Sequence, residues 1–307
     1  MLSNDLMKEK SNIARVQRFS IDDGPGIRTT VFFKGCPLRC KWCHNPECIG
    51  PGIEIQFRKP ICVNCGACVS VCPANAHCFQ DGKHVYQRDN CQFCLNCVKA
   101  CWYNALEICG KSYTVDSLFS QLLQDLPFFR SGGGVTLSGG EPLLYCKFCS
   151  ELIKKLKSMQ IHIAIDTCGH IAWENMKLIL EYADLILYDI KCIDGALHKA
   201  LTTQDNQLIL DNFNKLCKYP VPVWLRIPLI AGLNDNIELM IRTADYLVGK
   251  RNIEQIDLIP YHSYGVSKYE SFGIPCESAT YQKPALQHLK NISSLFVNRG
   301  FVCNIRN

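Results

Sequence analysis

The chain of 307 residues lacks the features of several large protein classes. Its start, MLSNDLMKEK, contains acidic residues and no apolar core of a secretory signal, and no apolar stretch approaches the ~20 residues of a membrane span. No long run of charges of one sign occurs, and a net charge of +5 is too small to indicate nucleic-acid binding. We therefore expect a cytoplasmic protein that binds neither nucleic acid nor membrane.

The composition also excludes a disordered or low-complexity protein, because 48% of the residues are hydrophobic and only 20% are charged. Cysteine, in contrast, is abundant: there are 21, and they are clustered. In a reducing compartment, clustered cysteines indicate metal ligation or redox chemistry rather than disulfides, and an odd number fits a disulfide framework badly.

Hydrophobic patterning predicts strands that alternate with helices. Apolar runs rich in β-branched and aromatic residues predict six strands, at 29–33, 135–137, 162–165, 185–190, 221–230 and 255–260. Helical periodicity lies between most of them, at 115–126, 147–159, 173–182, 208–219, 237–248 and 284–297. This alternation predicts a mostly parallel sheet, either a partial barrel or an open doubly wound sheet, with the functional site at the carboxyl ends of the strands.

Residues 1–14 are interpreted as a polar leader. Residues 50–112 interrupt the alternation of strands and helices and are interpreted as an inserted domain. The insert contains C-x2-C-x2-C-x3-C twice, a spacing typical of two iron–sulfur clusters in which the fourth cysteine of each run ligates the other cluster. We therefore assign one cluster to Cys62, Cys65, Cys68 and Cys101, and the other to Cys91, Cys94, Cys97 and Cys72. A pair of zinc sites is the alternative, because zinc sites also use C-x2-C.

A different motif precedes the insert: Cys36, Cys40 and Cys43, directly after the predicted strand at 29–33. Three thiolates leave one iron of a four-iron cluster with an open position, which allows a metal site to bind a substrate. Cys48 is not expected to be a fourth ligand, because C-x3-C-x2-C is complete without it. The remaining cysteines without recognisable spacing, including the Cys146/Cys149 pair, are interpreted as small packing residues.

These residues resemble a known family. The C-x3-C-x-aromatic-C motif is similar to that of the radical S-adenosylmethionine (SAM) enzymes. The longer string from Asp23-Gly-Pro-Gly-Ile-Arg28 to His44-Asn-Pro-Glu47 resembles the glycyl-radical-enzyme activating enzymes, of which many carry a two-cluster ferredoxin-like insert. The resemblance implies an α/β fold, a partial (β/α)6 radical-SAM barrel formed by 1–49 and 113–307, with the ferredoxin-like insert at 50–112.

Polar residues at the ends of the predicted strands have both a structural and a functional interpretation. A Gly-Gly-Glu turn is by itself an ordinary strand-to-helix turn, and Asp189 with Lys191 on one strand face is by itself a structural ion pair. The resemblance implies instead that they bind SAM. The cofactor-binding residues that it implies are Trp42, Cys43, His44, Gly139, Gly140, Glu141, Asp166, Thr167, Asp189, Ile190, Lys191, Arg226 and His262.

The resemblance further implies a monovalent cation beside Asp166 and Thr167, although Cys168 stands where the family often has Asn. The turn Asp23-Gly-Pro-Gly26 is expected to guide a peptide of the partner into the barrel mouth, with a plain turn as the alternative.

The implied activity is that of an oxidoreductase with three 4Fe–4S clusters. A flavodoxin or ferredoxin donates an electron, SAM is cleaved to a 5′-deoxyadenosyl radical, and this radical takes hydrogen from a glycine Cα of a partner glycyl radical enzyme. Two alternatives remain at this stage: a radical SAM enzyme that acts on a small molecule, and a ferredoxin-type electron carrier.

Overall fold

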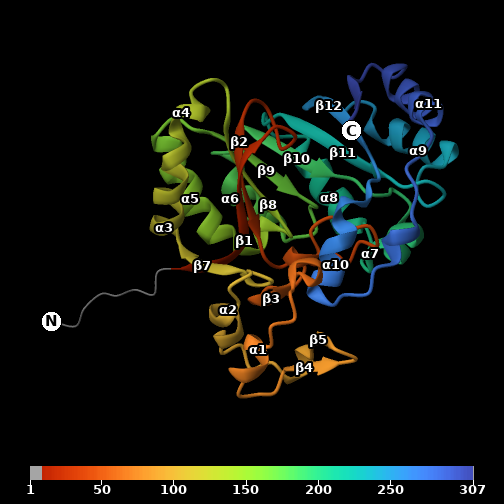
Figure 1. Ribbon diagram of the computed structural model, residues 1–307. Helices are drawn as coiled ribbons and strands as arrows, with labels where there is room; N and C mark the ends of the chain where they lie inside the picture. The colour runs from red at the N-terminus through yellow and green to blue at the C-terminus, as the bar shows by residue number, and fades with distance from the viewer. Residues whose placement is uncertain (1–8, 307) are drawn as a thin grey trace.

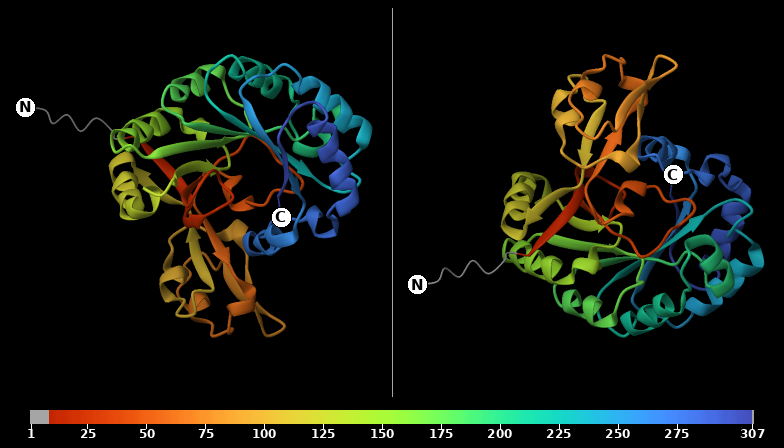
Figure 2. Two further views of the ribbon diagram at one scale, coloured as in Figure 1. Left: turned by 90° about the horizontal axis from the view of Figure 1, so that it is seen from above. Right: turned by 90° about the horizontal axis from the view of Figure 1, so that it is seen from below.

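The computed structural model describes residues 9–306 and contains a nine-stranded sheet that curves into a partial barrel with helices outside it (Figures 1 and 2). The strand order is β13-β12-β11-β10-β9-β8-β2-β1-β7. The strands are β1 (Lys10–Ser20), β2 (Arg28–Phe33), β7 (Lys111–Thr114), β8 (Gly134–Gly139), β9 (His162–Thr167), β10 (Leu185–Asp189), β11 (Val223–Leu229), β12 (Ile253–Pro260) and β13 (Cys303–Ile305).

The six predicted strands correspond to β2, β8, β9, β10, β11 and β12, and they pair with one another in parallel. The prediction of a mostly parallel sheet is therefore confirmed, and the curvature selects the partial barrel. Three strands outside this set were not predicted: β13, which is parallel to β12, and the antiparallel strands β1 and β7 beyond β2. The predicted polar leader was wrong from Lys10 onward, because β1 begins there; residues 1–8 lie outside the described part.

Helices cover the outer face of the sheet (Figure 2). They are α3 (Val115–Leu122), α4 (Leu126–Phe129), α5 (Cys146–Ser158), α6 (Trp173–Leu180), α7 (Gly195–Thr202), α8 (Gln207–Leu216), α9 (Ile237–Leu247), α10 (Val266–Phe272) and α11 (Leu286–Val297). The sequence did not predict α7 and α10, which are only two turns long. Within residues 9–306, no helix is long and apolar enough to cross a membrane.

Strand alternation separates the core from the barrel interior, as β11 illustrates. Val223, Leu225 and Ile227 are buried in the main core with residues of the outer helices, whereas Trp224 and Arg226 alternate with them and remain partly accessible. The polar residue in this apolar strand is therefore on the inner face, where a ligand would be held.

The insert forms a separate lobe below the barrel, beside α10 (Figure 1). Its elements are the antiparallel pair β3 (Glu54–Phe57) and β6 (Leu106–Cys109), the hairpin β4 (His77–Gln80) and β5 (Lys83–Tyr86), and the short helices α1 (Ala67–Ser70) and α2 (Asn96–Ala100). Glu54 pairs with Cys109, so the two ends of the insert lie side by side.

Candidate active site

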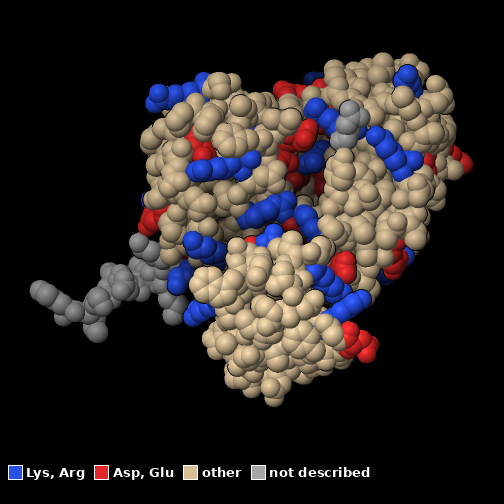
Figure 3. Space-filling view, in the orientation of Figure 1, with Lys and Arg blue, Asp and Glu red and all other residues tan. Residues whose placement is uncertain are grey.

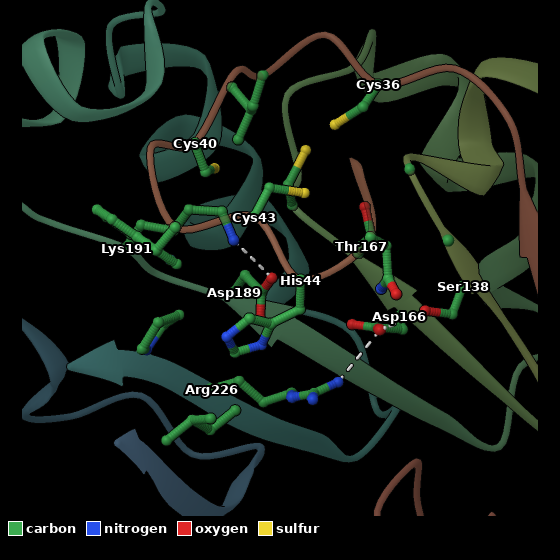
Figure 4. A pocket seen from close by; sticks show the side chains of 18 of the residues that line it. Cys36, Cys40, Cys43, His44, Ser138, Asp166, Thr167, Asp189, Lys191 and Arg226 are labelled. Atoms are coloured by element: carbon green, nitrogen blue, oxygen red, sulfur yellow. Dashed lines mark hydrogen bonds and ion pairs between the residues drawn. The ribbon is translucent and has the colours of Figure 1, made fainter. Parts of the chain in front are cut away.

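A cavity of about 170 Å³ lies at the carboxyl ends of the parallel strands (Figure 4). Most residues that the sequence predicted for the site line it. They are Cys36, Cys40, Trp42, Cys43, His44, Gly139, Gly140, Asp166, Thr167, Asp189, Lys191 and Arg226. Glu141, Ile190 and His262 are not among the lining residues.

The loop with three of these cysteines leaves the carboxyl end of β2 and bends back to it. Hydrogen bonds from the amides of Gly35 and Cys36 to the carbonyls of Cys48 and Ile49 (2.8 and 3.1 Å) close the loop. Cys36, Cys40 and Cys43 line the cavity, whereas Cys48 is fully buried beside the loop and does not.

The thiols of this loop differ in their electrostatic surroundings. A hydrogen bond from the thiol of Cys168 lowers the pKa of Cys36, whereas burial raises the pKa of Cys40 to about 11 and that of Cys43 to about 12. Metal ligation requires the thiolate form of cysteine, so binding of a cluster would release the thiol protons of Cys36, Cys40 and Cys43. The positive charge of the iron would then stabilise the buried thiolates.

Helix α10 holds the loop from outside, through contacts that sequence analysis missed. Lys268 Nζ donates to the carbonyl of His44 (2.9 Å) and forms an ion pair with Glu47 (2.8 Å), and the Tyr269 hydroxyl donates to the carbonyl of Cys43 (2.9 Å). The string His44-Asn-Pro-Glu47 was the only sequence signal near these contacts. Its partners lie more than 200 residues away along the chain.

Asp189 and Lys191 form an ion pair (2.7 Å), and both line the cavity (Figure 4). Burial lowers the pKa of Lys191, but the charges of Asp189 and Cys40 outweigh this effect and the net shift is upward. Lys191 is therefore a permanent cation beside the cysteine loop. The structural and functional interpretations of this pair are compatible, because the pair is formed and also faces the cavity.

A second polar group comes from the strands β8, β9 and β11. Asp166 accepts a hydrogen bond from the Ser138 hydroxyl (2.6 Å) and forms an ion pair with Arg226 (3.1 Å), as Figure 4 shows. Burial raises the pKa of Asp166 and outweighs the lowering effect of Arg226. Ser138 was part of a quoted motif but was not predicted as a site residue; its strand-end position was the available signal.

Glu141 differs from its expected place. Its side chain is fully buried, and Oε2 accepts hydrogen bonds from the Thr167 hydroxyl (2.8 Å) and the Cys168 amide (2.9 Å), while Oε1 accepts one from the Leu143 amide (3.1 Å). The carboxylate thus faces the protein and not the cavity. It joins the end of β8 to the end of β9 and holds the lining residues Thr167 and Cys168 in place.

The paired glycines are required by close backbone packing. A Cβ on Gly139, which has φ +111°, would lie 2.3 Å from the Phe33 amide nitrogen, and one on Gly140 would lie 2.1 Å from the Gly35 carbonyl oxygen. Any side chain here would push the cysteine loop away from β8. The two glycines therefore allow the loop and the cavity wall to meet.

Four predicted residues pack around the loop or beside it. His44 and His262 stack with ring centroids 3.9 Å apart, and His44 Nε2 and His262 Nδ1 are buried without a protein partner. Trp42 is buried in a small cluster with Tyr261. Ile190 is buried, and its amide donates to the carbonyl of Arg226.

The insert brings its cysteines together in two groups. A small cavity of about 20 Å³ is lined by Cys62, Cys65, Cys68 and Cys101, although the fourth is more than 30 residues from the third along the chain. Cys97 is surrounded by the second group and interacts electrostatically with Cys91, Cys72 and Cys94. Each group combines three cysteines of one run with the last cysteine of the other, which is the pairing that the spacing predicts.

These sites suit iron–sulfur clusters and SAM. Three thiols converge on one cavity, four converge on another, and the unpartnered histidine nitrogens lie at the edge of the first. The cavity also offers both an ammonium and carboxylates, the groups that a methionyl zwitterion requires.

Comparison with known proteins agrees with this chemistry. The Radical SAM superfamily matches residues 88–244, and a 4Fe-4S dicluster domain matches residues 54–102. A domain of the pyruvate-formate lyase-activating enzyme from Bacteroides vulgatus has a similar structure, with a TM-score of 0.50 and 28% identity over 57% of this chain and 99% of that chain.

Three curated relatives are similar along most of their length. Choline trimethylamine-lyase activating enzyme of Oleidesulfovibrio alaskensis is 40% identical, over 87% of this chain and 89% of its own. Trans-4-hydroxy-L-proline dehydratase activating enzyme of Clostridioides difficile is 40% identical, over 94% and 97%. 4-hydroxyphenylacetate decarboxylase activating enzyme of Clostridium scatologenes is 37% identical, over 97% and 98%.

The barrel, its cysteine loop and the matched domain define a radical SAM enzyme with iron–sulfur clusters. Within that superfamily, the chain belongs to the glycyl-radical-enzyme activating enzymes. Its protein substrate is a glycyl radical enzyme and its chemistry is of the oxidoreductase type, so the small-molecule and electron-carrier alternatives are not supported.

Proposed function

We propose that Cys36, Cys40 and Cys43 ligate a 4Fe–4S cluster and that the surrounding cavity binds SAM. The cluster, when bound, supplies the electron and the open iron position through which SAM is cleaved to a 5′-deoxyadenosyl radical. The protein binds and orients SAM and excludes water. The observation that carries this proposal is the convergence of the three thiols with two buried ion pairs on one cavity.

The residues around the cysteine loop divide the recognition of SAM between them. Lys191 Nζ is suited to the methionyl carboxylate, and Asp189 to the ammonium. The stacked His44 and His262, with their unpartnered nitrogens, and the buried Trp42 are suited to the nucleoside, because they offer hydrogen-bonding nitrogen atoms and a flat apolar surface.

The residues expected to bind the monovalent cation already interact with other protein groups. Asp166 already pairs with Arg226, and Thr167 donates to Glu141 while its hydroxyl accepts the amide hydrogen of Gly169. A cation beside these residues must displace Arg226 from Asp166. Binding of SAM measured in potassium, sodium and tetramethylammonium salts tests this part, and equal affinity in all three argues against a cation site.

The turn Asp23-Gly-Pro-Gly26 precedes β2, so it lies at the opposite end of that strand from the cysteine loop. Arg28 is fully buried and holds the turn by donating to the carbonyl of Pro25 (3.1 Å) and to the Thr136 hydroxyl (2.6 Å). Figure 3 shows a hollow lined by charged side chains at the upper centre of the molecule. We propose that the partner's glycine loop enters the barrel from the side of this turn.

The insert, proposed as residues 50–112 between barrel segments 1–49 and 113–307, would hold two further clusters. These would give three in total and relay an electron from a flavodoxin or ferredoxin. Alanine at both Cys65 and Cys94 should slow activation by such a donor, and unchanged activation would remove the relay. A cytoplasmic location suits this chemistry, because all 21 cysteines are free.

The partner is a glycyl radical enzyme, and sequence similarity to the relatives does not distinguish which one. Two relatives named for a lyase and a dehydratase are each 40% identical to this chain. The partner can be identified by mixing the reduced protein with several purified glycyl radical enzymes in turn. The partner is the enzyme that develops the electron paramagnetic resonance (EPR) signal of a glycyl radical.

The central test is formation of 5′-deoxyadenosine from SAM by the anaerobically reconstituted, reduced protein beside Cys40→Ala. We expect the product from the unaltered protein alone. The same replacement at Cys48, which does not line the cavity, is the matched control and should retain the activity. No product from the unaltered protein with all clusters present would contradict the proposal.

A further inference from the structure

Hairpin β4–β5 of the insert places a buried histidine against two proposed cluster ligands. His84 Nε2 lies 3.3 Å from Cys68 Sγ, and His84 Nδ1 lies 3.7 Å from Cys62 Sγ. The His84 side chain is held between rings, with Phe57 in an edge contact at 4.6 Å, and its backbone amide donates to Asn64 Oδ1 (2.9 Å). Both ring nitrogens therefore face sulfur atoms of one proposed cluster.

A second buried histidine on the same hairpin determines how the first one bonds. His77 Nδ1 lies 2.9 Å from His84 Nε2. If His77 donates to Nε2, the proton of neutral His84 is on Nδ1, which faces Cys62. If Nε2 carries the proton, it lies between His77 Nδ1 at 2.9 Å and Cys68 Sγ at 3.3 Å. The contact with His77 therefore determines whether His84 donates to Cys62 or is shared between His77 and Cys68.

The hairpin is stiffened by a second ring contact. The ring of Tyr86 stacks on His77 with centroids 4.6 Å apart. His77, which contacts His84, is thus held in place from its other side.

We propose that hairpin β4–β5 tunes one insert cluster, with His84 donating to Cys62 or Cys68. Hydrogen bonds to ligand sulfurs stabilise the reduced cluster, which carries more negative charge, and so raise its reduction potential. This inference rests on the proposed assignment of two clusters to the insert. His84 and His77 are positioning residues, since they act on the cluster through the ligand sulfurs.

A different use of the same residues is a small metal site. Cys68, His77 and His84 offer ligand atoms that lie within 4.8 Å of one another and would suit zinc. The cavity beside them contains four cysteines, however, and a zinc ion on Cys68 would remove one ligand from that group. Zinc in place of iron in the reconstituted protein would overturn the inference.

The test is an EPR-monitored redox titration of the full-length reconstituted protein and three variants. We expect His84→Leu to shift the potential of one insert cluster to a more negative value and to leave that of the other unchanged. His84→Gln keeps an N–H donor and should recover part of this shift. Gln80→Leu, on the exposed end of the same hairpin, should change neither potential.

The outcomes separate this inference from the proposed clusters. Insert signals that are present with full iron content, and that do not move in His84→Leu, would overturn the tuning and leave the clusters in place. Absence of the insert signals from the unaltered protein would overturn the cluster assignment, and the tuning with it. If His84→Leu loses iron, the comparison of His84→Gln with Gln80→Leu still decides the result, because only His84→Gln should shift a potential.

Discussion

The buried charged groups of the site are satisfied in two different ways. Glu141 is held by three hydrogen bonds from uncharged donors, whereas Asp189 depends on the charge of Lys191. The first arrangement stabilises the backbone around the cavity, and the second leaves a charged pair at its wall. Replacement of each residue should therefore have a different effect on folding and on SAM binding.

Replacement of Lys191 by Met leaves the carboxylate of Asp189 buried without its partner. Breaking a fully buried pair costs about 3–5 kcal/mol of stability, so we expect a smaller loss for this partly buried pair, together with loss of SAM affinity. Thermal unfolding and isothermal titration with SAM measure the two effects. Lys155→Met breaks an exposed pair with Asp116 and should change stability by about 1 kcal/mol or less, without an effect on SAM. Equal behaviour of the two variants would contradict the role of Lys191.

Replacement of Glu141 by Gln keeps the shape of the side chain but directs an amide NH2 at a neighbouring N–H or O–H donor. A buried donor without an acceptor costs about 1–3 kcal/mol, so we expect a lower unfolding temperature. Loosening of the Thr167–Cys168 segment should also weaken SAM binding. Glu151→Gln, at an exposed position of α5, is the control. A SAM affinity unchanged in Glu141→Gln would show that the hydrogen bonds of Glu141 do not contribute to SAM binding.

At the scale of elements, a helix that sequence patterning did not predict holds the cysteine loop. α10 has seven residues, too few for a clear amphipathic pattern, yet it provides both Lys268 and Tyr269. The predicted strands were recognised because they form apolar runs rich in β-branched and aromatic residues. β1, β7 and β13 lie at or next to the two ends of the sheet, and their polar residues obscure the pattern.

Removal of the hydroxyl in Tyr269→Phe should accelerate loss of iron from the cysteine loop, because the carbonyl of Cys43 loses its donor. The cost in stability is about 1 kcal/mol. Tyr246→Phe removes a hydroxyl that is also hydrogen-bonded, to Asn214, far from the loop. We expect the two variants to be similar in unfolding temperature and different in the rate of iron release to a chelator; similar rates would refute the anchoring role.

At the scale of the whole molecule, the insert is a lobe whose ends meet at Glu54 and Cys109 (Figure 1). Segments with adjacent ends can be removed with little effect on the rest of a domain. The barrel keeps its own core of sheet and outer helices, which is separate from the small core of the insert around Ile55 and Phe57.

Replacement of residues 55–108 by two glycines should therefore leave a folded barrel that cleaves SAM when a small chemical reductant supplies electrons. Activation with a protein donor should be lost if the insert relays electrons. Product formation under both reductants is the measurement. A variant that works equally well with both would contradict the relay, and circular dichroism would establish that the barrel is folded.

The sequence by itself determined the family, six strands of the barrel and the cysteine motifs, including the exchange of the fourth cysteine between the two runs. These properties are local, because ligand spacing and strand periodicity involve residues within a few positions of one another. The tertiary structure decided which other groups meet: Lys268 with Glu47, and His84 with Cys68. It also turned the carboxylate of Glu141 away from the cavity, because hydrogen bonds from Thr167 and Cys168 satisfy it there. Such contacts depend on how distant segments pack, and no local pattern encodes them.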